Sequence, residues 1–439
     1  MGIARLRPLA LAGLAAAAVV TPARCVAQST ASPAAPAPKL HVEGVFDDIL
    51  AFEDLHDKPR DFLMNTTRAT LRLSGTLDPH LEYRLGVVGR LHTGSLHVDN
   101  VPFLPPRLRS TIVQAGPAGG RSGAGRYLEN EIASALYVQE AYATFRAAGL
   151  YLRAGRQKVQ SGTGYAYNPT DLFNRRVPLD PTYEADGVDA VAIGFTFSPK
   201  SELQLLAAPR GDPSYRARFQ GSARGLGLAL QFTSIVRGRV DWQRVNTLAA
   251  VDRLDDGRLA VEDFERRFRW NQLAAEFSKT TRGLHLYGEL GVAFIRQPAD
   301  PGTLGPDSRT HERLLLGADY TFASKLHVVA EYMRLGEGRA SGERLTLNDE
   351  MASFKGETLS ADVDNAFVEV SRPLSGKVAA ALKVLGMLDH AAVGVNPWLY
   401  VDPRPKLRLA ASLYGFLGRA ESTYSNVGLG AFLELKYTF

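Results

Sequence analysis

The chain has 439 residues, a formal net charge of +5 and a single cysteine, so no disulfide can form within it. After the N-terminus, no stretch reaches the ~18 consecutive apolar residues of a membrane-spanning helix, and none is expected in the mature chain. The sequence contains no basic–aromatic groove motif, so a nucleic-acid partner is not expected either.

The N-terminus has the pattern of an export signal. Residues 1–27 combine arginines, the apolar run "PLALAGLAAAAVV" and small residues Cys25 and Ala27 before the predicted cut. A lipoprotein signal that uses Cys25 is the alternative, but Arg24 is the wrong residue to precede it. Cleavage after Ala27 removes three arginines and no acid, so the charge falls to +2 and the basicity largely belongs to the signal. Residues 28–39 then form a Pro/Ala-rich linker.

The rest of the chain, 40–439, is rich in segments where apolar residues occupy every second position. Examples are "RATLRLSGTL" (68–77), "HLEYRLGVVGRL" (80–91), "LHLYGELGVAF" (284–294) and "NVGLGAFLELKYTF" (426–439). A period of two is typical of β-strands with one apolar and one mostly polar face. Repeated strands of about ten residues favour a transmembrane antiparallel β-barrel over a soluble sheet.

The connections between these segments alternate in length. We predict eight short turns, at 77–80, 146–149, 198–201, 222–225, 278–283, 323–325, 372–376 and 402–406. Long loops are predicted at the opposite ends, including 93–133, 160–184, 237–266, 296–310 and 337–362. With a first strand near 40–52 and a last near 424–439, the total is about 18 strands, with short periplasmic turns and long extracellular loops.

Aromatic residues recur at the predicted short-turn ends of strands, as in "FTF" (195–197), "YTF" (320–322) and the terminal "KYTF". Such rings are typical of the interface between membrane and water. The chain end is also similar to that of outer-membrane barrels in general, which commonly end in Phe. That resemblance implies that Tyr437 and Phe439 form a signal for the membrane's assembly machinery.

Residue alternation places a set of charged side chains on the inner face of four neighbouring strands. These predicted pore-lining residues are Arg68, Arg72, Glu82, Arg84, Arg90, Glu140 and Arg153. Basic residues in a pore favour anions, although any polar lumen needs charges and opposite charges can pair across strands. Glu82 and Glu140 are the only nearby acids that we expect to neutralise these arginines.

The loop 160–184 contains "YNPTDLF", in which Tyr167 precedes a helix-start signal. Asn168 fits a helix N-cap and Asp171 fits the first turn, which predicts a short helix at about 169–174. Such a loop either folds into the lumen and constricts it or packs on the barrel rim. The sequence leaves both open.

No catalytic or metal-binding set is apparent. The nine histidines show no paired ligand spacing, and "SGTG" at 161–164 lacks a serine between its glycines as a nucleophile elbow requires. We therefore predict no catalytic residues, no metal site and no cofactor.

One hairpin, "LYVQEAYATFRAAGLYLRAGRQKV" (136–159), resembles the alginate-export family of outer-membrane porins through its "GRQ" (Gly155, Arg156 and Gln157). The resemblance implies an 18-stranded barrel with an arginine-rich lumen. Alternation puts Arg156 on the outer face unless a bulge intervenes at Gly155. The next stretch, "GTGYAYNPTDLFN", looks more like uncharacterised outer-membrane barrels.

Together these patterns indicate a channel in the outer membrane of a Gram-negative-type bacterium that passes small, anionic solutes by passive diffusion. The alternatives are an exporter of an acidic polysaccharide and an outer-membrane enzyme. The expected partners are outer-membrane lipid and lipopolysaccharide, the assembly machinery, and a small solute or polyanion.

Overall fold

The computed structural model describes residues 40–53, 62–112, 124–174, 176, 184–209, 211–255, 257–296, 310–419, 422 and 428–439. The predicted signal peptide (1–27) and linker (28–39) lie outside the described residues. The first strand begins at His41, close to its predicted start. The last begins at Gly430, later than position 424, and residues 424–427 also lie outside the described residues.

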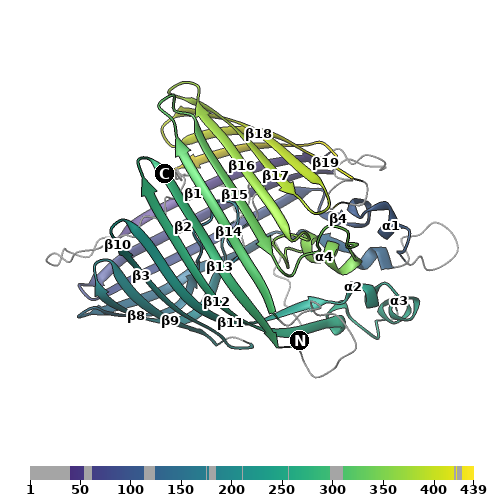
Figure 1. The fold of residues 1–439 in the computed structure, drawn as a ribbon, viewed down its shortest axis with the longest axis horizontal. Helices are drawn as coiled ribbons and strands as arrows, with labels where there is room; N and C mark the ends of the chain where they lie inside the picture. Colours follow the sequence, from purple (N-terminus) through teal and green to yellow (C-terminus); the bar gives the residue numbers. More distant parts are fainter. Residues whose placement is uncertain are drawn as a thin grey trace.

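The described residues form one barrel of 18 antiparallel strands (Figure 1). The barrel strands are β1 (His41–Glu53), β2 (Phe62–Asp78), β3 (Leu81–Gly94), β6 (Ala135–Ala147), β7 (Leu150–Lys158), β8 (Gly187–Ser198), β9 (Ser201–Ala208), β10 (Ser214–Ala223), β11 (Leu226–Val240), β12 (Glu265–Thr281), β13 (Leu284–Arg296), β14 (Thr310–Thr321), β15 (His327–Leu335), β16 (Asp364–Pro373), β17 (Val378–Met387), β18 (Ala392–Arg404), β19 (Leu407–Gly418) and β20 (Gly430–Thr438).

The barrel closes between its first and last strands. β1 pairs with β2 on one side and with β20 on the other, in a register that runs from Val45 opposite Thr438 to Glu53 opposite Gly430. A closed sheet leaves no strand edge with unpaired backbone groups. The predicted all-β antiparallel barrel of about 18 strands is confirmed.

All eight predicted short turns connect neighbouring strands at one end of the barrel, which we call the short-turn end. Three of them have both central residues at positive φ, namely Ala148–Gly149, Arg224–Gly225 and Arg282–Gly283. Two-residue turns of this kind match the right-handed twist of the flanking strands. The local turn chemistry therefore fixes the register of these hairpins.

The opposite, long-loop end carries the helices, as Figure 1 shows. These are η1 (Val101–Phe103), α1 (Pro106–Arg109), η2 (Ala124–Tyr127), α2 (Trp242–Val245), α3 (Leu248–Asp255), η3 (Val261–Phe264) and α4 (Leu347–Phe354), beside the small sheet of β4 (His97–Asp99) and β5 (Glu129–Glu131). Their apolar side chains pack into a shared core that includes Leu104, Trp242 and Met351. Among the described residues, no helix has the length and apolar character needed to cross a membrane.

Side chains alternate between the two faces of the barrel wall as the sequence predicts. On β13, Leu286, Leu290 and Phe294 are 42–54% exposed on the outside, whereas Tyr287 and Glu289 are buried inside. The phenylalanines near the short-turn end also lie outside and are exposed: Phe145, Phe197, Phe277, Phe322 and Phe439. The outer face is thus an apolar belt, and the inner face carries the polar residues.

Candidate functional site in the barrel interior

The connection between β7 and β8 folds into the barrel rather than onto its rim. We call residues 159–174 the inner loop. The Glu289 carboxylate accepts the N–H groups of Thr163 (2.7 Å), Gly164 (2.9 Å) and Thr170 (3.1 Å) and the hydroxyl of Thr170 (2.6 Å). Because Glu289 projects from the inner face of β13, the inner loop lies against the interior wall.

A second carboxylate holds the middle of the inner loop. Glu331, on the inner face of β15, accepts the N–H groups of Tyr165, Ala166 (2.9 Å) and Tyr167 (3.1 Å) and the hydroxyl of Tyr287 (2.7 Å). The loop's carbonyls are bound in turn by strand side chains. The donors are Arg313 (2.9 Å) and Gln272 (3.3 Å) to Pro169, Gln231 (2.7 Å) to Thr170, Arg216 (3.2 Å) to Gln160, and Arg237 to Leu172. A buried loop must satisfy its backbone groups in this way.

Two glycines allow the close approach of the inner loop to the wall. Gly162 has φ +91°, and a Cβ there would lie 2.7 Å from Glu289 Oε1. A Cβ on Gly164 would lie 2.4 Å from Cδ2 of Leu315 on the wall and 1.9 Å from the carbonyl oxygen of Tyr167 in the loop itself. Any larger residue at either position would push the loop away from its carboxylate partner.

The inner loop contains no helix at 169–174, so that prediction is wrong. The Asn168 side chain donates a hydrogen bond to the Asn174 carbonyl (2.6 Å) and accepts one from the Arg176 N–H (2.8 Å). Asp171 accepts the N–H groups of Phe173 (2.8 Å), Asn174 (3.0 Å) and Ser161 (2.9 Å). Side chains that bind nearby backbone compete with helix formation.

The three predicted loop residues are all buried. Tyr167 packs among Tyr287, Leu315 and Phe367 on the interior wall. Burial raises the pKa of Asp171 to about 6, although its three N–H donors favour the ionised form.

The predicted arginines of β2 are paired with acids that the sequence analysis did not identify. Arg68 contacts Asp47 on β1 and Glu184 (3.4 Å), and Arg72 contacts Glu43 (3.5 Å) and Glu184 (2.8 Å). The expectation that Glu82 and Glu140 are the only nearby acids is therefore wrong. Glu184 lies in the β7–β8 connection, 116 residues after Arg68, so its contact with β2 could not be deduced from local spacing.

Glu184 also binds Lys158 at 3.0 Å and lies at the centre of a cationic group. Its burial raises its pKa, but Lys158, Arg68 and Arg72 together outweigh burial and hold the pKa at about 2. Glu184 is therefore ionised at neutral pH and cancels part of the positive charge around it.

The two acids that were predicted also have partners. Glu140 Oε2 lies 3.3 Å from Arg84 Nε, and Glu82 Oε1 lies 3.2 Å from Arg146 Nε. A register shift between Gly86 and Val87 leaves Gln139 without a paired residue opposite it on β3. This bulge lets Gln139 and Glu140 both remain buried inside.

Arg90 and Arg153 have aromatic and hydroxyl partners instead. Arg90 donates to the Tyr137 hydroxyl (3.3 Å), and Arg153 donates to the Thr144 hydroxyl (3.0 Å) with its guanidinium 4.7 Å from the ring centre of Tyr142. Within the described ranges, neither arginine forms an ion pair with an acid. Of the predicted set, these two keep the most available positive charge.

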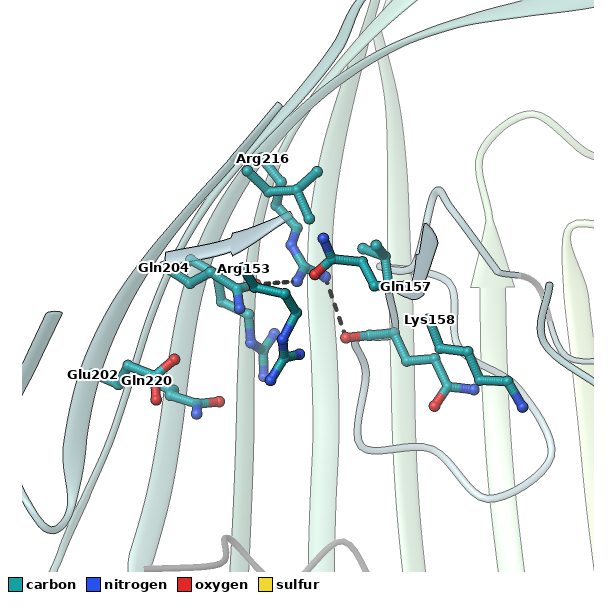
Figure 2. Close-up of a pocket in the computed structure, with 11 residues that line it drawn as sticks. Arg153, Gln157, Lys158, Glu202, Gln204, Arg216 and Gln220 are labelled. Atoms are coloured by element: carbon teal, nitrogen blue, oxygen red, sulfur yellow. Dashed lines mark hydrogen bonds between the residues drawn. The ribbon is translucent and has the colours of Figure 1, made fainter. Parts of the chain in front are cut away.

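Arg153 opens into a polar cavity of about 230 Å³ on the wall of β7, β9 and β10, which we call the cationic pocket (Figure 2). Its charged lining residues are Arg153, Lys158, Glu202, Arg216 and Arg218, with Gln157, Gln204 and Gln220 between them. Figure 2 shows Arg153, Gln157 and Arg216 directed toward the same space. Arg216 binds Gln204 and the Gln160 carbonyl, both neutral, whereas Arg218 is paired with Glu276.

Arg216 and Arg218 were missed by the sequence analysis although a signal existed. In "SYRARFQ" they alternate with Tyr215 and Phe219, both of which are exposed on the outside. The "GRQ" segment behaves as alternation predicts without a bulge. Arg156 stays in register opposite Asp189 on the outer face, and the two form an ion pair of 3.4 Å. In the part of the chain that the structure describes, no group of three or more His, Cys, Asp or Glu is arranged for a metal ion.

Comparison with known proteins found no matching family model and no matching curated protein, so the likeness of 136–159 to the alginate-export family has no further support. Among solved structures, OccAB4 of Acinetobacter baumannii aligns with a TM-score of 0.55 at 9% identity over 91% of this chain and 98% of that one. The likeness shows a shared barrel fold.

Two further solved structures align over similar lengths. OmpT of Vibrio cholerae gives a TM-score of 0.46 at 10% identity over 92% of this chain and 100% of that one. A mutant of the Rh. blastica porin gives 0.44 at 10% identity over 91% and 100%.

Proposed function

We propose that the protein is an outer-membrane channel through which small anionic solutes diffuse passively. The observation that carries this proposal is the cationic pocket, where Arg153 and Arg216 have neutral partners beside an inner loop that narrows the interior. A confined space with low-dielectric walls focuses the field of such charges and raises the local concentration of anions.

The outer face supports the membrane location. Leucines and phenylalanines are exposed around the barrel, and the closed ladder leaves no strand edge among the described barrel strands. In lipid every backbone polar group must be bonded internally, which a closed barrel achieves. The long-loop end would then face the cell exterior and the short-turn end the periplasm.

The ion pairs revise which arginines act on the solute. Arg68, Arg72 and Arg84 each contact a carboxylate, so their charges are largely cancelled. Arg90, Arg153 and Arg216 contact neutral groups. We therefore propose that the last three set the preference for anions, whereas Lys158 and Arg218 at the pocket edge are paired with Glu184 and Glu276.

The chain end supports a separate proposal on assembly. Tyr437 and Phe439 lie on the outer face and are 39% and 40% exposed, so a partner can reach both rings. We propose that they form the recognition signal of the outer-membrane assembly machinery. Deleting Phe439 should lower the amount of folded, heat-modifiable protein in outer membranes, and an unchanged yield would contradict this role.

Planar-bilayer recording of the purified, refolded protein tests the channel directly. Discrete current steps from the wild-type protein support the proposal, and fractionation should place the native protein with outer membranes. Correctly folded barrel that inserts but carries no current would exclude a channel.

A further inference from the structure

Four stacked aromatic side chains lie on the inner faces of β18, β19 and β20, beside Phe416 on β19. They are Trp398, Tyr400, Tyr414 and Phe432, and we call them the aromatic wall. The alternate residues Leu399, Leu413 and Leu433 are 44%, 62% and 54% exposed on the outside, so the four rings lie on the inner face. None of the four forms a hydrogen bond with the described part of the inner loop.

The four rings have nearly parallel planes. Trp398 and Tyr400 are 5.5 Å apart at 5°, Trp398 and Phe432 are 6.3 Å apart at 10°, and Tyr414 and Phe432 are 4.8 Å apart at 21°. This regularity links three strands into one continuous aromatic surface.

Small residues beneath the rings set their orientation. A Cβ on Gly430 would lie 1.9 Å from Cζ of Tyr414, so that ring lies directly over the glycine backbone. On β19, Ser412 lies between Trp398 and Phe432, and Ala410 lies between Tyr400 and Glu434. Both small residues are buried beneath the wall. One face of the aromatic wall therefore rests on the sheet, and Tyr400, Tyr414 and Phe432 remain partly exposed toward the lumen.

Charged donors and acceptors surround the aromatic wall. Lys383 Nζ lies 5.5 Å from the Trp398 ring centre, and the Arg408 guanidinium lies 5.6 Å from that of Tyr400. Glu434 follows Phe432 at the next inward position of β20 and lies 3.5 Å from Lys436. The aromatic wall is therefore an apolar surface with positively and negatively charged side chains at its edges.

We propose that the aromatic wall is a binding track for neutral pyranose sugars that pass through the lumen, an inference that rests on the proposed channel function. The C–H faces of a pyranose ring are apolar and gain by covering aromatic faces, while its hydroxyls need both donors and acceptors at the edges. An aromatic solute would use the ring faces but would leave Lys383, Arg408 and Glu434 without new partners.

The test measures block of the ion current by cello-oligosaccharides of one to six units in planar bilayers. Longer oligomers should block the wild-type channel at lower concentration because they cover more rings. Phe432→Leu, which keeps an apolar side chain but removes the ring, should weaken the apparent Kd about tenfold, equivalent to about 1.4 kcal/mol. Phe432→Tyr should keep the wild-type affinity.

Tyr137→Leu provides the matched control, since Tyr137 is an inward tyrosine on β6, outside the aromatic wall and four strands from β20, and should leave the block unchanged. A conducting wild-type channel that no oligosaccharide blocks, or equal block in Phe432→Leu, overturns the sugar track and leaves the channel intact. If benzoate or phenol blocked the ion current and the sugars did not, the assignment of sugars as the ligand class would be wrong.

A second readout does not depend on conductance. The chain has three tryptophans, and Trp398 is the one in the aromatic wall. Cello-oligosaccharide should change the fluorescence of the folded protein in detergent, and Trp398→Phe should lose that change while keeping the sugar block. Binding in detergent without current in bilayers would retain the sugar site and refute the channel. Absence of any fluorescence change and of any block would refute the site.

Discussion

Inward-facing glutamates behave differently in the two halves of the barrel interior. On β13 and β15, Glu289 and Glu331 each accept three N–H groups of the inner loop and one hydroxyl. On β3 and β9, Glu82 and Glu202 each contact one side-chain group, the Arg146 guanidinium and the Tyr151 hydroxyl. The acids on β13 and β15 hold the inner loop, and we call this side the anchored half. The polar groups on β3 and β9 border the open lumen, and we call that side the open half.

The comparison shows that an inward direction does not define a role. Alternation places both kinds of glutamate on the inner face of the barrel. Whether a glutamate binds the inner loop or only lines the lumen depends on whether the inner loop reaches it. The anchored half supports the inner loop, and the open half contains the cationic pocket. Substitutions in the two halves should therefore have different consequences.

The largest effect is expected from Glu289→Ala combined with Glu331→Ala. Each buried N–H that loses its acceptor costs about 1–3 kcal/mol, so the inner loop should leave the wall. Single-channel conductance should rise, and amide exchange at 162–170 should accelerate. Glu82→Ala is the control, since Glu82 lies outside the cationic pocket and accepts no N–H group of the inner loop in the described residues, and it should leave the conductance nearly unchanged. Equal conductance in the double variant and wild type would show that the loop does not limit flow.

The next effect concerns charge in the open half. Arg153→Gln should lower the preference for anions, because Arg153 has no acid partner in the described part of the chain. The reversal potential in a salt gradient measures this preference. The control removes an ion pair as a whole, through Arg84→Gln with Glu140→Gln, and should shift the potential much less. A larger shift in the pair variant than in Arg153→Gln would reverse our assignment.

A smaller, pH-dependent effect is expected at Glu184. Its pKa is lowered to about 2, so its stabilising contribution is complete above the ordinary glutamate pKa and is lost as the pH falls toward about 2. Protonation would remove one negative charge from beside Arg68, Arg72 and Lys158 and increase the preference for anions. Glu184→Gln should show the increased preference already at neutral pH and should lose this part of the pH dependence. If the anion preference of Glu184→Gln depended on pH as it does in wild type, the pH dependence would belong to another group.

The smallest effect is expected at the long-loop end. The hydrogen bond to Asp362 (2.7 Å) raises the pKa of His390. Burial lowers this pKa by a smaller amount, so the net shift is upward. The raised pKa means that protonated His390 stabilises the fold below the ordinary histidine pKa, and that this contribution is lost as the pH rises through the raised value. The unfolding temperature of His390→Asn should therefore approach that of wild type as the pH rises above the ordinary histidine pKa. A constant difference would indicate a neutral hydrogen bond.

The barrel could be predicted from the sequence because its signals are local. A period of two assigns each side chain to a face, and turns such as Ala148–Gly149 mark where hairpins reverse. The inward direction of Arg68, Arg72 and Glu140 follows from the same rule, whereas Gln139 lies inside because of a bulge.

The interior contacts could not be predicted because they join distant parts of the chain. Thr163 and Glu289 are 126 residues apart, and Arg68 and Glu184 are 116 apart. "YNPTDLF" has the local pattern of a helix start, yet long-range partners and its own Asx-type hydrogen bonds fix it in another conformation. The aromatic wall was also missed, since its rings come from three strands.

The reversal potential of the wild-type channel in a potassium chloride gradient shows whether the cationic pocket selects anions. At low ionic strength the potential should have the sign set by chloride permeation, and it should shrink as the salt concentration rises and screens the pocket charges. A potential of the sign set by potassium at low salt would contradict the proposal that the cationic pocket governs passage.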